Sequence, residues 1–340
     1  MNGRVPAAGE LVLHIGAPKT GSSTIQRHCC LNSAELRSAG LLYPPHPLDD
    51  NGVSGGHGGL FAGPVETVRE RLAGHLADAR LADCRLLLSA ESIFADADAV
   101  IAALPTTAFH VICFVRHPVD AIAAHHNQGI KRHGGTQTLE QAAAALVAGR
   151  IENRSLSGAV LLDWLRICGR ERMTVLPYVE HGRPVDSVAW FRGVLGLPAT
   201  TDDAPINRGY TPAAAEFRRL VNMLPGPTVA GFDGPLDLSL QEYSNASPSP
   251  RPTATDILSP DRLAALEAFY RDDVLRLEGA FGIRLEQRDT RPAAETDTLV
   301  DVWRHVARDA ALAGQVRAAV ATVAADHSAR VRLAPLLTLP

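Results

Sequence analysis

The sequence predicts an α/β fold in which helices flank a central parallel sheet, with a helical extension at the carboxyl end of the chain. Three observations support this prediction. Short apolar runs alternate with helical patterns, a glycine-framed turn separates the first run from the first helix, and an alanine-rich helical pattern follows residue 290. Alternation of this kind is typical of a parallel sheet whose strands are buried on both faces.

Four apolar runs have the length and composition of buried strands. They are residues 11–15, 85–90, 111–115 and 173–176. Each run is followed or preceded by a helical pattern, so we expect parallel strands that are joined by helices. In an open sheet of this type, ligands bind outside the carboxyl ends of the strands.

Proline and glycine mark the expected ends of the helices. A helix should follow Ser23, and Gly40 is placed to end it in the left-handed conformation. Pro64 and Pro118 are each placed to open a helix, because the fixed backbone angle of proline suits the first helical position. Further helices are expected at residues 156–168, which Gly169 ends, at 258–282, and beyond 290.

Two stretches interrupt the alternation. Residues 51–59 are too rich in glycine to form a regular element, and we expect a mobile loop there. Residues 233–255 are rich in proline and serine and are expected to form a surface excursion or a lid. The sequence thus predicts one domain over residues 1–289 and a helical extension over 290–340.

The composition excludes several classes of protein. The chain has 340 residues, of which 46% are hydrophobic and 21% charged, and it has no apolar run near the roughly 20 residues of a membrane span. A net charge of −4 argues against a nucleic-acid partner. The N-terminal region shows no signal peptide, and the five cysteines lack metal-ligand spacing. We therefore expect a cytoplasmic protein with no bound metal, whose cysteines pack as small apolar side chains.

The segment Gly16-Ala17-Pro18-Lys19-Thr20-Gly21-Ser22-Ser23-Thr24 connects the first strand to the first helix. Its two glycines have the spacing of the phosphate-binding motif G-x-x-x-x-G-K-[ST], in which backbone N–H groups hold phosphate oxygens. Here Ser22 and Ser23 replace the usual lysine and hydroxyl residue, and the cation lies inside the loop at Lys19. Only Lys19 and Lys131 of the 33 basic residues are lysine, which marks Lys19 as a selected feature. The helix N-terminus still predicts an anion site at Gly21 to Thr24.

The position of the lysine bears on the kind of anion. Transfer of an ATP γ-phosphate normally requires Mg²⁺ held by an acidic residue at another strand end, and the available strand ends offer Glu91 and Arg116. A sulfuryl group carries less charge than a phosphoryl group, so lysine and hydroxyl donors suffice to neutralise its leaving phosphate without a metal. Two alternatives stay open: a kinase-like P-loop phosphotransferase, and a non-catalytic nucleotide-binding protein on the same fold.

The glycine-framed segment resembles the 5′-phosphosulfate loop of sulfotransferases that use 3′-phosphoadenosine-5′-phosphosulfate (PAPS). The similarity is greatest to the bacterial, carbohydrate-type branch, with its K-T-G-[ST]-[ST] core. It implies a P-loop-like three-layer sandwich, PAPS as co-substrate, release of 3′-phosphoadenosine-5′-phosphate (PAP), and no metal. It also implies that Lys19 contacts the bridging oxygen and stabilises the departing phosphate. The nucleotide-binding residues implied here are Gly16, Pro18, Lys19, Thr20, Gly21, Ser22, Ser23 and Thr24.

A second signature of that family binds the 3′-phosphate. It consists of a strand followed by arginine, proline two residues later, and serine eight residues after the arginine. Arg116 and Pro118 fit this pattern, whereas Ala124 stands at the serine position. The planar guanidinium of arginine suits phosphate oxygens. Arg208, in a segment that resembles a later part of the family, is a further candidate nucleotide ligand.

Sulfuryl transfer to a hydroxyl group benefits from a base that takes the acceptor proton. Glu91 lies at a predicted strand end, and His57 lies in the glycine-rich loop with an ordinary pKa closer to neutral pH. We rank Glu91 first and interpret His14 as a packed, hydrogen-bonded core residue. The acceptor implied by the resemblance is a carbohydrate, a glycolipid or another small molecule, selected by residues 51–59 and 233–255.

Overall fold

The chain is described by a computed structural model that covers residues 10–48, 55–149, 158–198, 209–247, 253–289, 297–323 and 327–339. It divides into two compact units. The first comprises residues 1–121, 152–207 and 268–289, and the second comprises 122–151, 208–267 and 290–340. Two helices, α5 (Pro118–His133) and α13 (Pro260–Phe281), contribute residues to both units.

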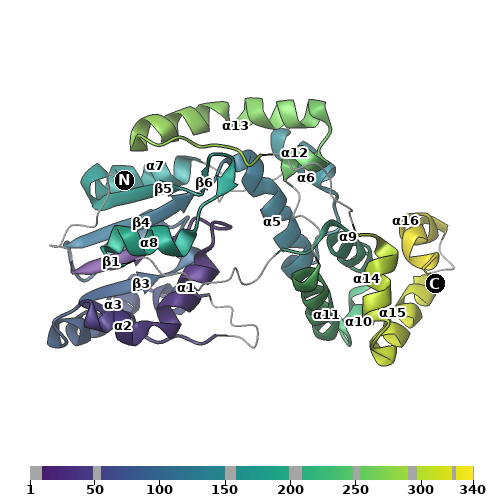
Figure 1. The fold of residues 1–340 in the computed structure, drawn as a ribbon, viewed down its shortest axis with the longest axis horizontal. Coiled ribbons are helices and arrows are strands. Elements are labelled where there is room, and N and C mark those ends of the chain that lie inside the picture. Colours follow the sequence, from purple (N-terminus) through teal and green to yellow (C-terminus); the bar gives the residue numbers. More distant parts are fainter. Residues whose placement is uncertain are drawn as a thin grey trace. The chain divides into compact units, whose positions relative to one another are not determined.

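A five-stranded parallel sheet in the order β2-β3-β1-β4-β5 forms the centre of the first unit (Figure 1). The strands are β1 (Leu11–His14), β2 (Leu41–Leu42), β3 (Arg85–Ser89), β4 (Phe109–Val115) and β5 (Met173–Pro177). The four strands predicted from apolar runs are confirmed. Strand β2 was not predicted, because two residues are too few to show a pattern.

Helices cover both faces of this sheet, which confirms the predicted three-layer α/β fold. They are α1 (Ser22–Leu31), α2 (Ser33–Ser38), α3 (Val65–Leu81), α4 (Ala97–Ala103), α7 (Gly158–Cys168), α8 (Ser187–Leu195) and residues 268–281 of α13. A small hairpin follows β5, with strands β6 (Val179–Glu180) and β7 (Arg183–Pro184). Short 3₁₀ helices are η1 (Gly58–Phe61), η2 (Glu91–Ile93) and η4 (Arg170–Arg172).

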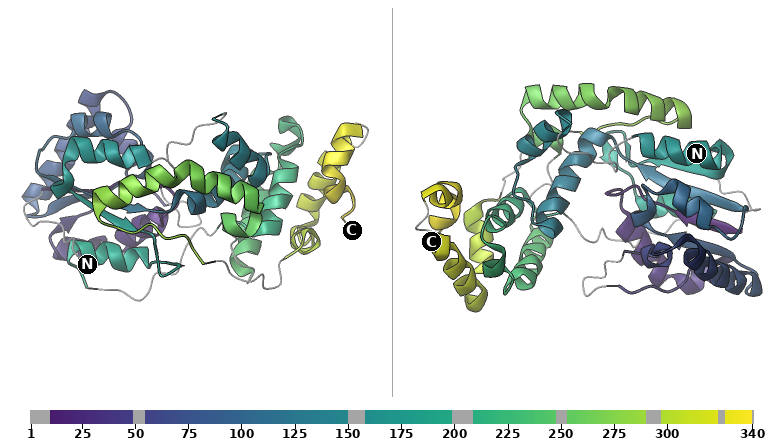
Figure 2. Two further views of the ribbon diagram at one scale, coloured as in Figure 1. Left: turned by 90° about the horizontal axis from the view of Figure 1, so that it is seen from above. Right: turned by 180° about the vertical axis from the view of Figure 1, so that it is seen from behind.

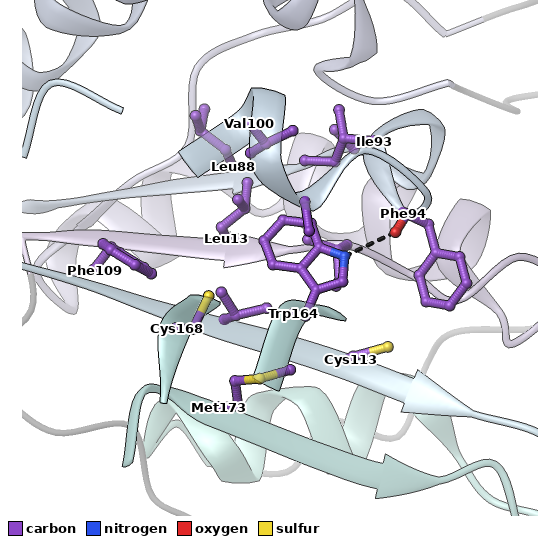
Figure 3. Packing of buried hydrophobic residues seen from close by; sticks show 14 of the residues in the cluster. Leu13, Leu88, Ile93, Phe94, Val100, Phe109, Cys113, Trp164, Cys168 and Met173 are labelled. Atoms are coloured by element: carbon purple, nitrogen blue, oxygen red, sulfur yellow. Dashed lines mark hydrogen bonds between the residues drawn. The ribbon is translucent and has the colours of Figure 1, made fainter. Parts of the chain in front are cut away.

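Successive strand residues point to opposite faces, and each face has its own core. Leu11 and Leu13 pack in the cluster that includes residues of α3, α4, α7 and α13, whereas Val12 packs with residues of α1 and α8. Trp164 lies at the centre of the first cluster, fully buried, and its indole N–H donates to the carbonyl of Phe94 at 2.8 Å (Figure 3). This bond gives the only polar atom of the indole a partner in an otherwise apolar layer.

The helix predicted between Ser23 and Gly40 is interrupted. Helix α1 ends at Leu31, and Asn32 leaves helical geometry with φ −109° and ψ 25° before α2 begins. The side-chain amide of Asn32 donates to the carbonyl of His28 at 2.9 Å, a local bond that competes with the helical ladder. Gly40 does adopt the predicted left-handed conformation, with φ 78°.

All regular elements among the described residues of the second unit are helices. Besides parts of α5 and α13, it contains α6 (Leu139–Val147), α9 (Pro212–Val221), α10 (Gly226–Val229), α11 (Asp233–Ala246), α12 (Ala254–Ile257), α14 (Leu299–Val306), α15 (Ala310–Val323) and α16 (His327–Leu337). Helix α14 lies beside α9 and α11, and α15 beside α16 (Figure 2). Phe217 of α9 stacks on Trp303 of α14 at 6.3 Å between ring centroids.

Helices on both sides of residue 290, the predicted domain boundary, contribute to one hydrophobic core. Leu236 of α11 is buried in one cluster with Val316 of α15 and Leu333 of α16. The described helices after residue 290 therefore share this core with α9 and α11.

The prediction of an excursion or lid over residues 233–255 is wrong for its first part. Residues 233–246 form α11, which buries Leu236, Leu240 and Ser244 at four-residue spacing on one face. The apolar and small residues at that spacing outweigh the proline and serine content, which is concentrated at 247–252; residues 248–252 lie outside the described part of the chain. Among the described helices, none combines the length and hydropathy required to cross a membrane.

Candidate active site

The carboxyl ends of four parallel strands lie at one edge of the sheet, and three of them lead to predicted site residues. Strand β1 leads into the Gly16 loop, β3 leads to Glu91, β4 to Arg116, and β5 to Tyr178. Strand β1 lies between β3 and β4, so the chain leaves β1 at the position where the strand order reverses. In open α/β sheets this position forms the binding crevice.

The loop from Gly16 to Gly21 folds against itself and against β4. The hydroxyl of Thr20 donates to the carbonyl of Ala17 at 2.7 Å, and the amide of Ala17 donates to the carbonyl of Phe114, also at 2.7 Å. Lys19 has φ 65° and Gly21 has φ 88°, so the chain turns sharply before α1 begins at Ser22.

The N-terminus of α1 has the properties of an anion site. The first N–H groups of a helix have no partner within it, and α1 has no side-chain cap and no acidic residue in its first turn. Its ten residues give a helix dipole whose positive end faces the loop. The positive end, Lys19, and the hydroxyl groups of Ser22, Ser23 and Thr24 thus occupy adjacent positions.

Gly21 is required both by its backbone angle and by the space around it. A Cβ atom at this position would lie 2.6 Å from the Oγ of Ser187, the first residue of α8, and 3.8 Å from Cε2 of Tyr178. Ser187 and Tyr178 therefore line the loop, and neither residue was predicted from the sequence. Tyr178 directly follows β5, and that strand-end position was the available signal.

Glu91 lies close to the lysine of the loop. Its Cγ is 3.4 Å from where a Cβ of Gly16 would be, and a hydrogen bond links Glu91 to Ser22. Burial raises the pKa of Glu91 above its ordinary value, and the positive charge of Lys19 and the bond with Ser22 oppose that rise. A carboxylate with a raised pKa next to an anion site is suited to accept a proton.

His57 does not have the freedom expected of a loop base. The ring is buried, its Nδ1 accepts a hydrogen bond from the amide of Ser89 at 3.0 Å, and its Nε2 lies 2.8 Å from the carbonyl of Pro44. Nε2 must therefore carry the proton and donate it. Burial lowers the pKa of His57 to about 4. Both ring nitrogens hold backbone groups together, so we interpret His57 as structural and correct its assignment as a base.

The segment around His57 was predicted from its glycines to be a mobile loop, but hydrogen bonds hold its described part in place. The amide of His57 donates to the carbonyl of Ser89 at 2.7 Å, and Gly56 packs against Gln26 and that same carbonyl. The described part of the predicted loop, residues 55–59, is thus fixed to the end of β3. Residues 51–54 lie outside the described chain.

His14 is the packed core histidine that the sequence predicts. It is fully buried, its Nδ1 lies 2.8 Å from the Oγ of Ser89, and burial lowers its pKa to about 3. Its ring packs edge-on against Phe114 and Phe191. Of the cysteines, Cys29, Cys113 and Cys168 are buried as expected, whereas Cys30 and Cys84 are half-buried.

Arg116 is held at the end of β4 by an aromatic ring and a carboxylate. Its guanidinium lies over the ring of Tyr178, 5.5 Å from the centroid. Burial lowers the pKa of Arg116, the negative charge of Asp120 opposes this effect, and the positive charge of Arg288 adds to it. The buried Nε has no hydrogen-bond partner among the residues that the structure describes.

A small pocket lies beside Arg116. Its walls include Pro18, Phe94, Leu161 and Asp273, and its volume is about 20 Å³. That volume is sufficient for about one water molecule. The pocket is therefore too small for an acceptor.

Ala124 and Arg208 were also considered for the nucleotide site. Ala124 lies on α5 in the part of that helix that belongs to the second unit. Arg208 lies outside the described residues. Within the described residues, no group of three or more histidine, cysteine, aspartate or glutamate side chains is arranged to hold a metal ion.

Comparison with known proteins gives structural matches only. No family model matches the chain, and no curated protein matches it. Among solved structures, the chain is similar to a sulfotransferase from Alicyclobacillus acidocaldarius, with 17% identity, a TM-score of 0.46, and coverage of 82% of this chain and 96% of that chain.

Two sulfotransferase domains are also similar to the chain. One comes from the curacin biosynthetic pathway, with 14% identity, a TM-score of 0.37, and coverage of 83% of this chain and 100% of that domain. The other comes from the Synechococcus PCC 7002 olefin synthase, with 15% identity, a TM-score of 0.34, and coverage of 84% and 100%. All three structures are sulfotransferases. At these identities and TM-scores, the chemistry of the present chain must be derived from its own residues.

Proposed function

We propose that the chain is a PAPS-dependent sulfotransferase that transfers a sulfuryl group to a hydroxyl acceptor and releases PAP. The observation that carries the proposal is the position of Lys19. It lies inside a glycine-framed loop at the N-terminus of α1, and its charge acts on the half-buried carboxyl group of Glu91. One site thus combines an anion cradle, a cation and a base.

The loop residues would hold the 5′-phosphosulfate end of PAPS. The positive end of α1 and the hydroxyl groups of Ser22, Ser23 and Thr24 favour the 5′-phosphate. Lys19 would neutralise the charge that develops on the phosphate oxygen as the bond from that oxygen to sulfur breaks. Gly16 and Gly21 allow the backbone angles, φ 101° and 88°, that this turn requires.

Glu91 would take the proton of the acceptor. As the acceptor oxygen bonds to sulfur, its proton must leave, and a carboxylate with a raised pKa is a better base than an ordinary surface carboxylate. PAP leaves with the electron pair of the broken bond on its 5′-phosphate. The acceptor class remains that implied by the sequence resemblance: a carbohydrate, a glycolipid or another small alcohol.

Two observations bear on whether the site fits a nucleotide with a second phosphate. Arg116 presents a half-buried guanidinium at the neighbouring strand end, and among the described residues its Nε has no hydrogen-bond partner. Tyr178 lies between Arg116 and Gly21, within contact distance of both positions. An aromatic ring between two cationic sites is suited to the sugar or base that separates two phosphates.

Transfer of labelled sulfate from PAPS tests the proposal directly. The wild-type protein is incubated with ³⁵S-labelled PAPS and a panel of carbohydrates, glycolipids and simple alcohols. We expect transfer to at least one acceptor, and we expect Lys19→Ala to lower the rate by a factor of about 100 to 1,000, as for loss of one transition-state donor. Arg27→Ala, which removes a charge farther along α1, serves as the control and should retain activity.

Thermal stabilisation by ligands separates the alternatives. PAP without a metal should raise the melting temperature, whereas a P-loop phosphotransferase would be stabilised by ATP with Mg²⁺. Stabilisation by PAP without sulfate transfer to any acceptor would indicate a non-catalytic nucleotide-binding protein. Full activity in Lys19→Ala would exclude the proposed mechanism.

A further inference from the structure

Residues 55–59, Gly-Gly-His-Gly-Gly, contact the end of β3 just before Glu91. The amide of His57 donates to the carbonyl of Ser89 at 2.7 Å, and the amide of Ser89 donates to Nδ1 of His57 at 3.0 Å. The side chain of Ser89 is held as well, because its Oγ lies 2.8 Å from Nδ1 of His14. Three hydrogen bonds to two histidines thus fix the residue that precedes Glu91 by two positions.

The bonds from His57 replace those of a longer neighbouring strand. The last pairing of β2 with β3 is at Leu86. The amide of Ala90 donates to the carbonyl of His14 in β1 at 2.9 Å, so the amide of Ser89 faces the other side of β3, where β2 has already ended. There the backbone and the ring of His57 supply the donor and the acceptor that a continued strand would provide.

The ring of His57 is itself held in place. Its Nε2 donates to the carbonyl of Pro44 at 2.8 Å, and it packs edge-on against Tyr43 and His46, with 4.6 and 4.9 Å between ring centroids. The hydroxyl of Tyr43 lies 2.8 Å from Nε2 of His46, and only 4% of His57 is exposed. The imidazole therefore links the segment after β2 to the end of β3.

The glycines of this segment bring its backbone close to the chain on both sides of Glu91. A Cβ at Gly56 would overlap with the carbonyl oxygen of Ser89. A Cβ at Gly58 would lie 2.6 Å from the Oγ of Ser92, the residue that follows Glu91. Larger residues at these two positions would prevent the approach, which explains why glycines surround the histidine.

We propose that His57 is a positioning residue for Glu91, and that residues 55–59 fix the end of β3 so that the carboxyl group lies beside the Gly16 loop. This inference rests on the proposed function, in which Glu91 takes the acceptor proton. The Cγ of Glu91 is 3.4 Å from where a Cβ of Gly16 would be, so the carboxyl group has little room to move without losing its place. A displacement of about 1 Å in an active site can lower the rate by about 100-fold. The bonds that fix Ser89 should therefore affect the rate through Glu91.

Two substitutions of His57 separate positioning from stability. Asparagine carries an acceptor oxygen at the position of Nδ1 but does not reach Pro44, whereas glutamine reaches Pro44 but has no acceptor at the position of Nδ1. Rates are measured with ³⁵S-labelled PAPS and the best acceptor from the panel of carbohydrates, glycolipids and simple alcohols. We expect His57→Gln to lower kcat by about 10- to 100-fold with a KM for PAPS close to that of the wild type, and His57→Asn to retain most of kcat.

The titration of Glu91 gives a second measurement that needs no acceptor. Carbon-13 NMR of protein labelled at the glutamate carboxyl carbons follows this titration, and the resonance of Glu91 is identified by its loss in Glu91→Gln. Burial raises the pKa of Glu91, while Lys19 and Ser22 oppose the rise. In His57→Gln the carboxyl group should become more solvated, so its pKa should fall towards the ordinary value of 4.5. In His57→Asn it should stay near that of the wild type.

His110→Gln is the matched control. His110 is 4% exposed, as is His57, its Nε2 lies 2.8 Å from Oγ1 of Thr174, and burial lowers its pKa to about 4. It lies at the amino end of β4, whereas Glu91 follows the carboxyl end of β3. His110→Gln should therefore lower the urea midpoint but leave both kcat and the titration of Glu91 unchanged.

The outcomes separate the two proposals. If no acceptor of the panel is sulfated, the proposed function fails, and if Glu91→Gln keeps the wild-type rate, Glu91 is not the base; this inference fails with either result. If Glu91→Gln is inactive but His57→Gln keeps the wild-type kcat and the wild-type titration of Glu91, only the positioning role of His57 is refuted. Equal losses of kcat in His57→Gln, His57→Asn and His110→Gln would likewise refute it, because that pattern indicates a general effect on the fold.

Discussion

Replacement of Gly21 by alanine should destabilise the protein more than the same change at another left-handed glycine. An alanine with φ 88° costs about 1–2 kcal/mol, because its Cβ meets the following carbonyl. The new Cβ would also lie 2.6 Å from the Oγ of Ser187 and 3.2 Å from its Cβ. Overpacking of this kind costs about 1–3 kcal/mol. We therefore expect Gly21→Ala to lower the free energy of unfolding by about 2–5 kcal/mol.

Gly40→Ala is the matched comparison. Gly40 has φ 78°, but no described atom beyond its own chain neighbours lies within 4 Å of where its Cβ would be. Only the backbone strain of about 1–2 kcal/mol should appear. Urea unfolding followed by circular dichroism, with the midpoint multiplied by the denaturant slope, measures both changes.

A double variant identifies the steric part. Gly21→Ala with Ser187→Ala removes the oxygen at 2.6 Å but leaves the carbon at 3.2 Å, so it should recover part of the lost stability. Ser187→Ala alone provides the baseline. Equal destabilisation by Gly21→Ala and Gly40→Ala, with no recovery in the double variant, would refute the close approach of α8 to the loop.

Three further changes should have measurable effects. Glu91→Gln should slow sulfate transfer by about 10²- to 10⁴-fold without loss of PAP binding, and the wild-type rate should rise with pH as the carboxyl group, whose pKa burial raises, becomes ionised. The pKa of His57 is about 4 in the folded protein and 6.5 in the unfolded chain. The neutral ring therefore stabilises the fold fully above pH 6.5, and this contribution decreases by up to about 3 kcal/mol as the pH falls through 4. The urea midpoint of His57→Gln should consequently depend less on pH than that of the wild type. Trp164→Phe removes the N–H donor that binds the carbonyl of Phe94 and should lower stability by about 1–3 kcal/mol, more than Trp190→Phe, in thermal unfolding.

Each of these expectations has a result that would contradict it. Wild-type rates in Glu91→Gln would remove Glu91 as the base. An unchanged pH dependence in His57→Gln would mean that the protonation of this ring does not oppose folding. Equal stability losses in Trp164→Phe and Trp190→Phe would show that the bond to Phe94 contributes nothing measurable.

Local patterns were sufficient to predict most of the first unit. Strand β1 is buried on both faces, so its apolar run is recognisable without knowledge of its neighbours. Gly40 and Gly169 adopt the left-handed angles expected from their positions after helical patterns. The break at Asn32 was not predicted, because a single asparagine within a helical pattern does not indicate that its side chain will bond to the carbonyl of His28.

Composition was misleading where packing decided the structure. Residues 233–246 form a helix and not an excursion, because Leu236 and Leu240 lie on one face that is buried against α9 and α14. The glycines near His57 predicted mobility, but the hydrogen bonds of its ring to Ser89 and Pro44 come from strands and loops distant in sequence. Intrinsic preference is a weak guide when such tertiary contacts compete with it.

The Gly16 to Thr24 loop was determined by the sequence itself, because an anion cradle made of consecutive backbone N–H groups requires glycines and hydroxyl residues at fixed spacing. The position of Glu91 followed from the same logic, since it comes directly after a recognisable strand. Only the tertiary structure decided that Tyr178 and Ser187 lie beside the loop and that both ring nitrogens of His57 bond to backbone groups. The physical reason is that the burial and the electrostatic environment of a side chain depend on which distant segments lie at the sheet edge. A local sequence pattern contains no information about those segments.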